Sequence, residues 1–450
     1  MVRSQAMPAV AARFAPFMIA ALIAAGCALV PTRPSSSPGL PTPVRHVLPN
    51  GVRVIVQDHR ASDVTALQLW VRAGGRDEAV SETGLAHYLE HMLFKGTTSR
   101  PTGFIDRDVE GVGGRMNAGT SLDYTYYHIV LPATNTGAAI DLLADISVNA
   151  SLDASVLEAE KRVVLEEMRL SEDNPRRFLS RRLHEAVFDG HPYGRPVIGT
   201  PELVRGLSRE TLLAFYRRLY VPESFTLVVV GPVSPSEVLD RARRSFGRLP
   251  RTGTLPLPAP PVPAVRQRRR VEMMRPGTQT YLGMAWHAPR RDHPDVAAVD
   301  LLVTILGQTR TSRLTRSLRD DLGLVSTVGS GYSALEAAGV VMVTAQMERT
   351  NLERVESEVL RELGRLRDQG VTEAERRRAI TAAEAQHEFV NETAEGRAQA
   401  LGRAETVWRL EDELAYLDRV RAVTRAQIQT VARKYLDPDR YVRVTFLSAP

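Results

Sequence analysis

Two histidines and a glutamate in the stretch His87-Tyr88-Leu89-Glu90-His91 have the spacing of a metal site on a helix. Residues four apart project from the same face of an α-helix, so His87 and His91 can hold one metal ion between two imidazoles. Glu90 shares that side, and its carboxylate can reach a metal-bound water. Zinc lowers the pKa of such a water to about 7, and the carboxylate can take the proton as hydroxide attacks a peptide carbonyl.

The residues around this stretch favour a helix. An apolar stripe lies beside the histidines and consists of Leu85, Leu89, Met92 and Leu93. The run then stops at Gly96. The alternative is a core helix whose histidines bind nothing, which would need two of only ten histidines to fall four apart by chance with a glutamate between them.

A second helix is expected over residues 153–170, and it is rich in carboxylates. Two histidines leave a zinc site one protein ligand short. Glu160 and Glu167 are seven residues apart, two helical turns, so they share a face, whereas Glu166 points about 100° away from Glu167. For Glu158 and Glu166, an ordinary solvent-facing helix surface is the simpler interpretation.

Four stretches of the chain together resemble the pitrilysin family of inverted zinc peptidases, family M16. The resemblance is to its bacterial branch, which is similar to the mitochondrial processing peptidase. The stretches are residues 84–97, 114–118, 160–168 and 191–194. The resemblance extends from about Val44 to the C-terminus.

The resemblance implies a role for five of these residues. His87, His91 and Glu167 correspond to the ligands of one Zn²⁺ per chain. Glu90 corresponds to the general base, and Glu160 to an acidic position that supports the ligands. The carboxylate adjacent to Glu167 remains an alternative for the third ligand.

Residues 113–131 are predicted to form a glycine turn followed by a strand, because β-branched and aromatic residues are frequent there. In the resembled family, the start of this strand is an open edge beside the zinc, where a substrate peptide adds as a further strand. Asn117 and Ala118 match the residues that meet the peptide. Such binding predicts broad selectivity for extended peptides.

The length of 450 residues is sufficient for two to three domains. Hydrophobic residues make up 43% and charged residues 24% of the chain, as in ordinary globular proteins. The net charge is +6, but the basic residues are dispersed among acids and no nucleic-acid recognition motif is present. We therefore expect a solvated, mildly basic surface and no nucleic-acid partner.

Residues 1–27 are predicted to be a secretory signal, because a basic start precedes a short apolar run over residues 17–25. Residues 24–27 resemble the bacterial lipobox, in which the cysteine is lipidated. Cys27 is the only cysteine, so the mature chain has no disulfide and no thiolate ligand. We expect a periplasmic lipoprotein anchored to the membrane, with residues 28–43 as a tether; the alternative is a plain signal peptide.

The chain repeats one pattern at the ends of two halves. A capped helix over residues 208–219 precedes a strand over 226–231, and a helix over 424–435 precedes a strand over 441–447. A tyrosine closes each helix, at Tyr220 or Tyr435, and a proline follows it. This indicates two homologous halves of about 200 residues.

The predicted boundaries are residues 44–248 for the zinc-bearing half, 249–265 for a proline-rich linker and 266–450 for the second half. Residues 295–306 would match the metal-binding helix but contain no histidine. We therefore expect an α+β fold with one metal site. By the resemblance, two α/β-sandwich-type halves face each other as a clamshell around a chamber.

Many active relatives carry an Arg and a Tyr in the second half that hold the substrate carbonyl. Here the residues after Gly339, 340–344, supply no arginine, and Tyr332 and Arg349 are poorly placed. The chain thus resembles the zinc-bearing subunit of relatives that divide this work between two subunits. The expected partners are a homologous subunit, as a heterodimer, or a second copy.

The sequence therefore predicts a zinc metalloendopeptidase that cuts peptides or unfolded segments in the bacterial cell envelope. One alternative is a zinc-binding subunit with little or no activity that captures extended peptides or assembles a larger complex. Another is a maturation protease with a single protein substrate.

Overall fold

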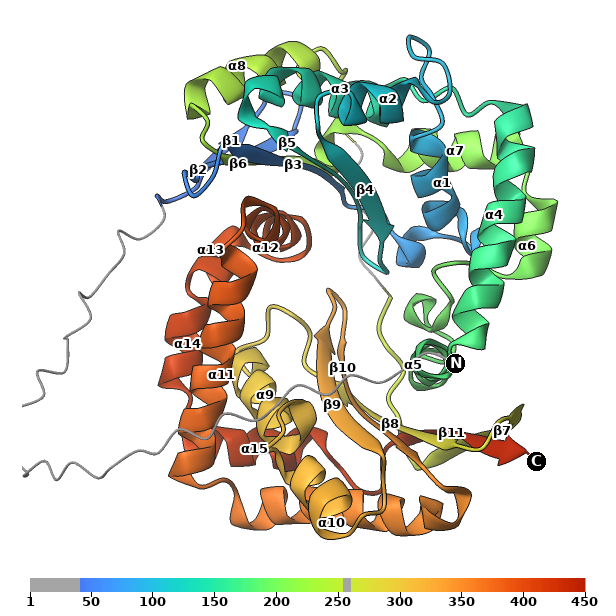
Figure 1. The fold of residues 1–450 in the computed structure, drawn as a ribbon, viewed down its shortest axis with the longest axis vertical. Coiled ribbons are helices and arrows are strands. Elements are labelled where there is room, and N and C mark those ends of the chain that lie inside the picture. Colours follow the sequence, from blue (N-terminus) through green and yellow to red (C-terminus); the bar gives the residue numbers. More distant parts are fainter. Residues whose placement is uncertain (1–40, 254–259, 450) are drawn as a thin grey trace, which may run out of the picture. The chain divides into compact units, whose positions relative to one another are not determined.

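The computed structural model describes residues 41–253 and 260–449, and within these the chain forms two β-sheets with helices on their faces (Figure 1). The predicted α+β fold class is confirmed. The predicted signal segment, Cys27 and most of the tether lie outside the described residues. In the described ranges, none of the helices combines the length and apolar character that a membrane crossing requires.

The elements are numbered in chain order. The strands are β1 (Val44–Val47), β2 (Arg53–Asp58), β3 (Val64–Val71), β4 (Arg115–Thr120), β5 (Thr125–Pro132), β6 (Phe225–Gly231), β7 (Arg269–Pro276), β8 (Thr280–Ala288), β9 (Thr327–Ala334), β10 (Gly339–Met347) and β11 (Val442–Ala449). The helices of the first half are α1 (Leu85–Leu93), α2 (Phe104–Glu110), α3 (Thr136–Val148), α4 (Ala154–Asp173), α5 (Pro175–Val187), α6 (Pro201–Gly206), α7 (Arg209–Leu219) and α8 (Pro235–Ser245). Those of the second half are α9 (Val296–Val303), α10 (Leu352–Gln369), α11 (Glu373–Asn391), α12 (Ala394–Val407), α13 (Leu410–Leu414), α14 (Tyr416–Ala422) and α15 (Arg425–Tyr435).

The two sheets share one strand order. The first is β1-β2-β6-β3-β5-β4 and the second is β7-β11-β8-β10-β9, so after β1 the strands correspond one to one. In both sheets the first corresponding pair, β2 with β6 or β7 with β11, is parallel, and the remaining pairs are antiparallel. The repeat that the sequence predicted from α7 with β6 and α15 with β11 is therefore present in the topology.

The first sheet is buried on both faces. Leu67 and Leu69 of β3 pack with helices α1, α3 and α8, whereas Ala66 and Trp70 pack against α12 on the opposite face. Alternate residues of a strand point to opposite faces, which explains this division. Gly402 of α12 lies so close to Trp70 that a Cβ atom would stand 2.0 Å from the indole nitrogen, so the helix requires glycine there.

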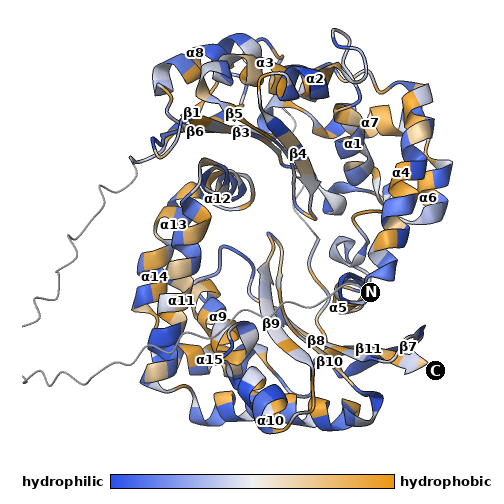
Figure 2. Cartoon of the chain, in the orientation of Figure 1, coloured by the Kyte–Doolittle hydropathy of each residue, from blue (hydrophilic) through white to orange (hydrophobic). Residues whose placement is uncertain are grey.

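The second sheet is covered in the same way by a helix of the first half. Leu179 and Leu183 of α5 pack on β8 and β11, opposite the face that carries α9, α10 and α15. Helix α5, which follows α4, thus lies on the second sheet, and helix α12, which follows α11, lies on the first sheet (Figure 1). Apolar and polar residues alternate along many of the helices, as packing on one side requires (Figure 2).

Residues 113–131 form a hairpin of two strands, β4 and β5, where the sequence predicted a turn and a single strand. The segment after β3 holds the turn over residues 121–124, because the carbonyls of Ser121 and Leu122 accept the N–H groups of Gly75 and Arg76. β4 ends the sheet and pairs only with β5 among the described strands. The edge of the sheet near α1 is therefore β4 alone, and not one strand that extends through residues 113–131.

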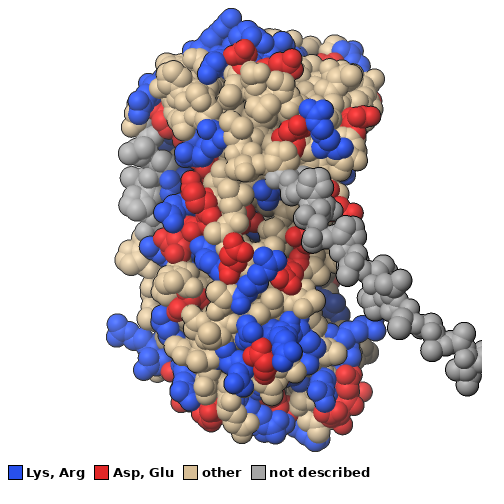
Figure 3. Space-filling model, turned by 90° about the vertical axis from the view of Figure 1, so that its left-hand side faces the viewer, with Lys and Arg blue, Asp and Glu red and all other residues tan. Residues whose placement is uncertain are grey.

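Charges of both signs lie side by side on the surface. On the face that Figure 3 presents, Lys and Arg side chains are interspersed with Asp and Glu. This distribution agrees with the expectation of a solvated, mildly basic surface.

Candidate metal centre

Helix α1, which carries two of the predicted ligands, has a defined start. Gly84 adopts a left-handed conformation with φ of 102°, and a Cβ there would lie 2.7 Å from the backbone of Gly199. The buried carboxylate of Glu78 accepts the N–H groups of Gly84 and Ala86, at 3.0 and 2.8 Å. These contacts fix the first turn of α1, one residue before His87.

The structure brings the three predicted ligands together. Nε2 of His87 and Nε2 of His91 lie 3.6 and 3.5 Å from Oε2 of Glu167 on α4. Two ligand atoms about 2.1 Å from a tetrahedral ion lie roughly 3.4 Å apart, so these separations fit one zinc ion. In residues 41–253 and 260–449, this is the one group of three His, Cys or carboxylate side chains with such spacing.

Glu160 orients His91 from the side opposite to Glu167. Its Oε1 lies 2.9 Å from Nδ1 of His91, and Lys95 holds its other oxygen at 3.0 Å. When Nδ1 donates its proton to Glu160, the lone pair of Nε2 faces Glu167, which is the arrangement a metal-binding imidazole needs. Nδ1 of His87, by contrast, is buried and has no hydrogen-bond partner in the described part of the chain.

Helix α4 separates the two adjacent carboxylates. Asp153 caps its start by accepting the N–H groups of Ser155 and Val156. Glu167 faces the histidines, whereas Glu166 pairs with Arg169 at 2.7 Å. The geometry therefore favours Glu167 over its neighbour as third ligand.

The electrostatics of the site suit a cation. Burial lowers the pKa of His87 to about 4, and the neighbouring His91 adds to this effect, so His87 is neutral at neutral pH. The pKa of Glu167 is lowered by its hydrogen bond with His91 and by the charge of that histidine. Burial opposes a charge on His91, but the carboxylates of Glu167 and Glu160 outweigh it and raise its pKa. A metal would displace that proton, so binding weakens as the pH falls.

Glu90 lies beside the three ligands and does not belong to them. The hydroxyl of Thr120, the last residue of β4, donates a hydrogen bond to its Oε2. Burial raises the pKa of Glu90, although this hydrogen bond opposes the shift. A carboxylate with a raised pKa is a stronger base, which suits proton transfer from water.

The predicted peptide-contact residues lie on the open edge next to Glu90. Asn117 is exposed and Ala118 is half-buried in β4. The Asn117 side chain accepts the N–H of Ala118 at 2.9 Å. An extended peptide that pairs with this edge would run past Thr120 and the metal ligands.

Tyr332 and Arg349, the two residues nearest to the expected Arg and Tyr positions, both make contacts within the second half. The hydroxyl of Tyr332 donates to the carbonyl of Pro289 at 2.5 Å, and Arg349 donates to the carbonyl of Ser448 at 3.4 Å. Both side chains are engaged within the second half.

Sequence reasoning missed Thr120 and Glu78. Thr120 lies two residues after Ala118, so the two side chains point to the same face of the strand, and this spacing could have identified Thr120. Glu78 lies in an irregular segment six residues before Gly84, and no local pattern identifies it.

Comparison with known proteins supports the family resemblance. Residues 53–201 match the family described as insulinase (peptidase family M16), and residues 206–383 match the peptidase M16 inactive domain. An uncharacterized zinc protease of Mycobacterium tuberculosis is 32% identical over 413 residues, covering 90% of this chain and 94% of the relative. One of Bacillus subtilis is 28% identical over 332 residues, covering 74% and 80%.

Solved structures share the fold. A protease from Helicobacter pylori has a TM-score of 0.86 at 24% identity, over 91% of this chain and all of that one. A peptidase M16 inactive domain from Pseudomonas fluorescens has a TM-score of 0.83 at 22% identity, over 91% and 98%. The matches to both family models and the 32% identity over nearly the whole length lead to one conclusion: this chain belongs to peptidase family M16, the insulinase or pitrilysin family.

Proposed function

We propose that this chain is a zinc metalloendopeptidase that hydrolyses peptides or unfolded polypeptide segments. The observation that carries the proposal is the convergence of His87, His91 and Glu167 beside a separate carboxylate, Glu90, and an open strand edge. Three protein ligands of nitrogen and oxygen leave a fourth position for water or substrate. The relatives' description as zinc proteases supports the same chemistry.

Each residue has a separate task in this reaction. Zinc, when bound, would lower the pKa of water and polarise the scissile carbonyl. Glu90 accepts the proton of the attacking water and later passes it to the leaving amine. Thr120 holds one oxygen of Glu90, which leaves the other oxygen available to the water. Glu160 keeps His91 in the tautomer that presents Nε2 to the ion.

The edge of β4 supplies the binding of substrate. Main-chain hydrogen bonds along this edge select an extended backbone and little else, so folded segments are excluded before side chains are compared. This supports peptides and unfolded segments as the substrate class.

Metal removal and restoration test the proposal. The chelator-treated chain should not cleave a pool of quenched fluorescent peptides, and one equivalent of zinc should restore cleavage. Retained cleavage without metal, or no cleavage by the zinc-loaded chain in any preparation, would count against the proposal.

A second candidate is a zinc-binding capture subunit with weak activity of its own. The engagement of Tyr332 and Arg349 within the second half favours it, because these two side chains are then not free to hold a scissile carbonyl. A homologous subunit that carries the Arg/Tyr pair would complete the site. Assay of the chain alone and with such a subunit separates the two candidates.

The cell envelope is the proposed location. The basic start, the short apolar run and the single cysteine at position 27 support a lipid-anchored periplasmic protein. Fractionation of cells that produce the full chain tests this location.

A further inference from the structure

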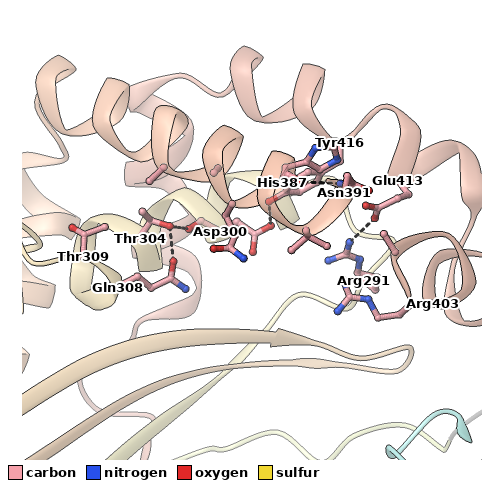
Figure 4. Close-up of a pocket in the computed structure, with 15 residues that line it drawn as sticks. Arg291, Asp300, Thr304, Gln308, Thr309, His387, Asn391, Arg403, Glu413 and Tyr416 are labelled. Atoms are coloured by element: carbon pink, nitrogen blue, oxygen red, sulfur yellow. Dashed lines mark hydrogen bonds and ion pairs between the residues drawn. The ribbon is translucent and has the colours of Figure 1, made fainter. Parts of the chain in front are cut away.

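The second half has a cavity at the place that corresponds to the metal centre. α1 follows β3 and lies against α4, and in the second half α9 follows β8 and lies against α11. Between α9 and α11 lies a cavity of about 610 Å³ (Figure 4).

The cavity is polar but is not a metal site. Asp300, Thr304 and Gln308 succeed one another at intervals of four along its wall, as His87 and His91 do on α1. Thr304 donates to Oε1 of Gln308 at 2.7 Å, which leaves the Gln308 amide N–H groups free. Within the described residues, no metal-binding cluster occurs here. The volume lies in the range of small-ligand sites, about 300–1,000 Å³.

Two guanidinium groups meet at one end of the cavity. Figure 4 shows Arg291 and Arg403 side by side there, and both lie over the ring of Trp408, with Cζ at 3.9 and 5.4 Å from its centroid. Arg291 reaches Glu413 only at 3.5 Å. Arg403 makes no hydrogen bond or ion pair within the described part of the chain.

This arrangement leaves donors available for an anion. Glu413 and Asp300 offset part of the charge of Arg291, whereas Arg403 has no ion pair among the described residues. Burial lowers the pKa of Arg291, and the nearby charge of Arg403 lowers it further. Planar guanidinium groups match a carboxylate in geometry.

We propose that this cavity binds the C-terminal carboxylate of a short peptide, with Arg291 and Arg403 on the carboxylate and the Gln308 amide on the main chain. Asp300 and Glu413 also line the cavity, and they disfavour a multiply charged anion more than a singly charged one. The choice of a peptide as the ligand rests on the proposed peptidase function, whereas the binding of a carboxylate does not. It gives the second half a binding role of its own, towards product ends or substrate C-termini.

Paired peptides test the proposal. Fluorescein-Gly-Gly-Ala-Ala-Leu is prepared as the free acid and as the C-terminal amide, and binding to the metal-free full chain is measured by fluorescence anisotropy. Metal removal prevents cleavage and prevents zinc from binding the carboxylate. We expect the acid to bind about tenfold more tightly than the amide, a difference of about 1.4 kcal/mol.

Matched arginine variants identify the site. Arg403→Gln should abolish the preference for the acid, whereas Arg377→Gln, at a side chain that is 74% exposed and outside the cavity, should retain it. Arg403 is exposed, so its replacement should leave the melting temperature unchanged. Equal affinity for acid and amide, no binding of either, or a preference that survives Arg403→Gln would overturn the proposal. Failure of the zinc-loaded chain to cleave peptides would refute the peptidase function and not this site.

Discussion

Thr120 at the end of β4 donates a hydrogen bond to the carboxylate of Glu90 on α1. The same strand whose edge is open to a peptide therefore holds the base that would act on that peptide. Because Thr120 lies two residues beyond Ala118, the position of the bound peptide and the orientation of Glu90 depend on one strand.

We predict that Thr120→Val lowers kcat by roughly ten- to a hundredfold while zinc content stays at one per chain, because a hydrogen bond to a charged group contributes about 1.5–3 kcal/mol. Steady-state kinetics and metal analysis of the purified variant provide the measurement. Thr120→Ser keeps the hydroxyl and is the matched control. Equal losses in both variants would mean that the methyl group, and not the hydrogen bond, is important.

Glu167→Gln should weaken zinc binding far more than Glu166→Gln. Only Glu167 faces His87 and His91, whereas Glu166 pairs with Arg169 on the exposed side of α4. Titration of each metal-free variant with zinc gives the two affinities. Equal losses, or a larger loss at Glu166, would show that the wrong carboxylate has been assigned.

The purified chain should bind zinc and peptide but cleave weakly by itself. Removal of one carbonyl donor typically costs roughly a hundred- to a thousand-fold in rate, and Tyr332 and Arg349 are engaged elsewhere. A homologous subunit with the Arg/Tyr pair should raise the rate by at least an order of magnitude. Full activity of the isolated chain, unchanged by any such partner, would refute the division of labour and leave the zinc assignment intact.

Cys27→Ser should release the protein from the membrane fraction or leave the precursor uncleaved. A single acyl chain gives only marginal membrane binding, and the bacterial modification that the lipobox resembles supplies several chains. Fractionation and mass measurement of the variant decide this. Unchanged processing and location would favour a plain signal peptide.

The metal centre was predictable because its geometry is mostly local. A spacing of four residues places His87 and His91 on one face of any helix, and a spacing of seven does the same for Glu160 and Glu167. The pairing of the two helices came from the family resemblance, since nothing in the spacing brings α1 to α4.

The contacts that complete the site were not predictable in this way. Thr120 and Glu90 are 30 residues apart, and their contact depends on where the edge of the sheet falls. The packing of α12 on the first sheet brings Gly402 against Trp70. Helices α5 and α12 each pack on the sheet of the other half, and the sequence of one half alone does not predict such a contact. The cavity between α9 and α11 likewise arises from residues that are spread over more than 120 positions.

Glu90→Gln provides the most direct test of the central claim. The amide keeps the shape of the side chain and can still bond Thr120, but it cannot accept the proton of the attacking water. Zinc content and peptide turnover are measured on the same preparation, with Glu166→Gln as the control. The account predicts one zinc per chain with turnover reduced by about a hundred- to ten-thousand-fold in Glu90→Gln alone. Near-normal turnover with zinc bound would contradict it.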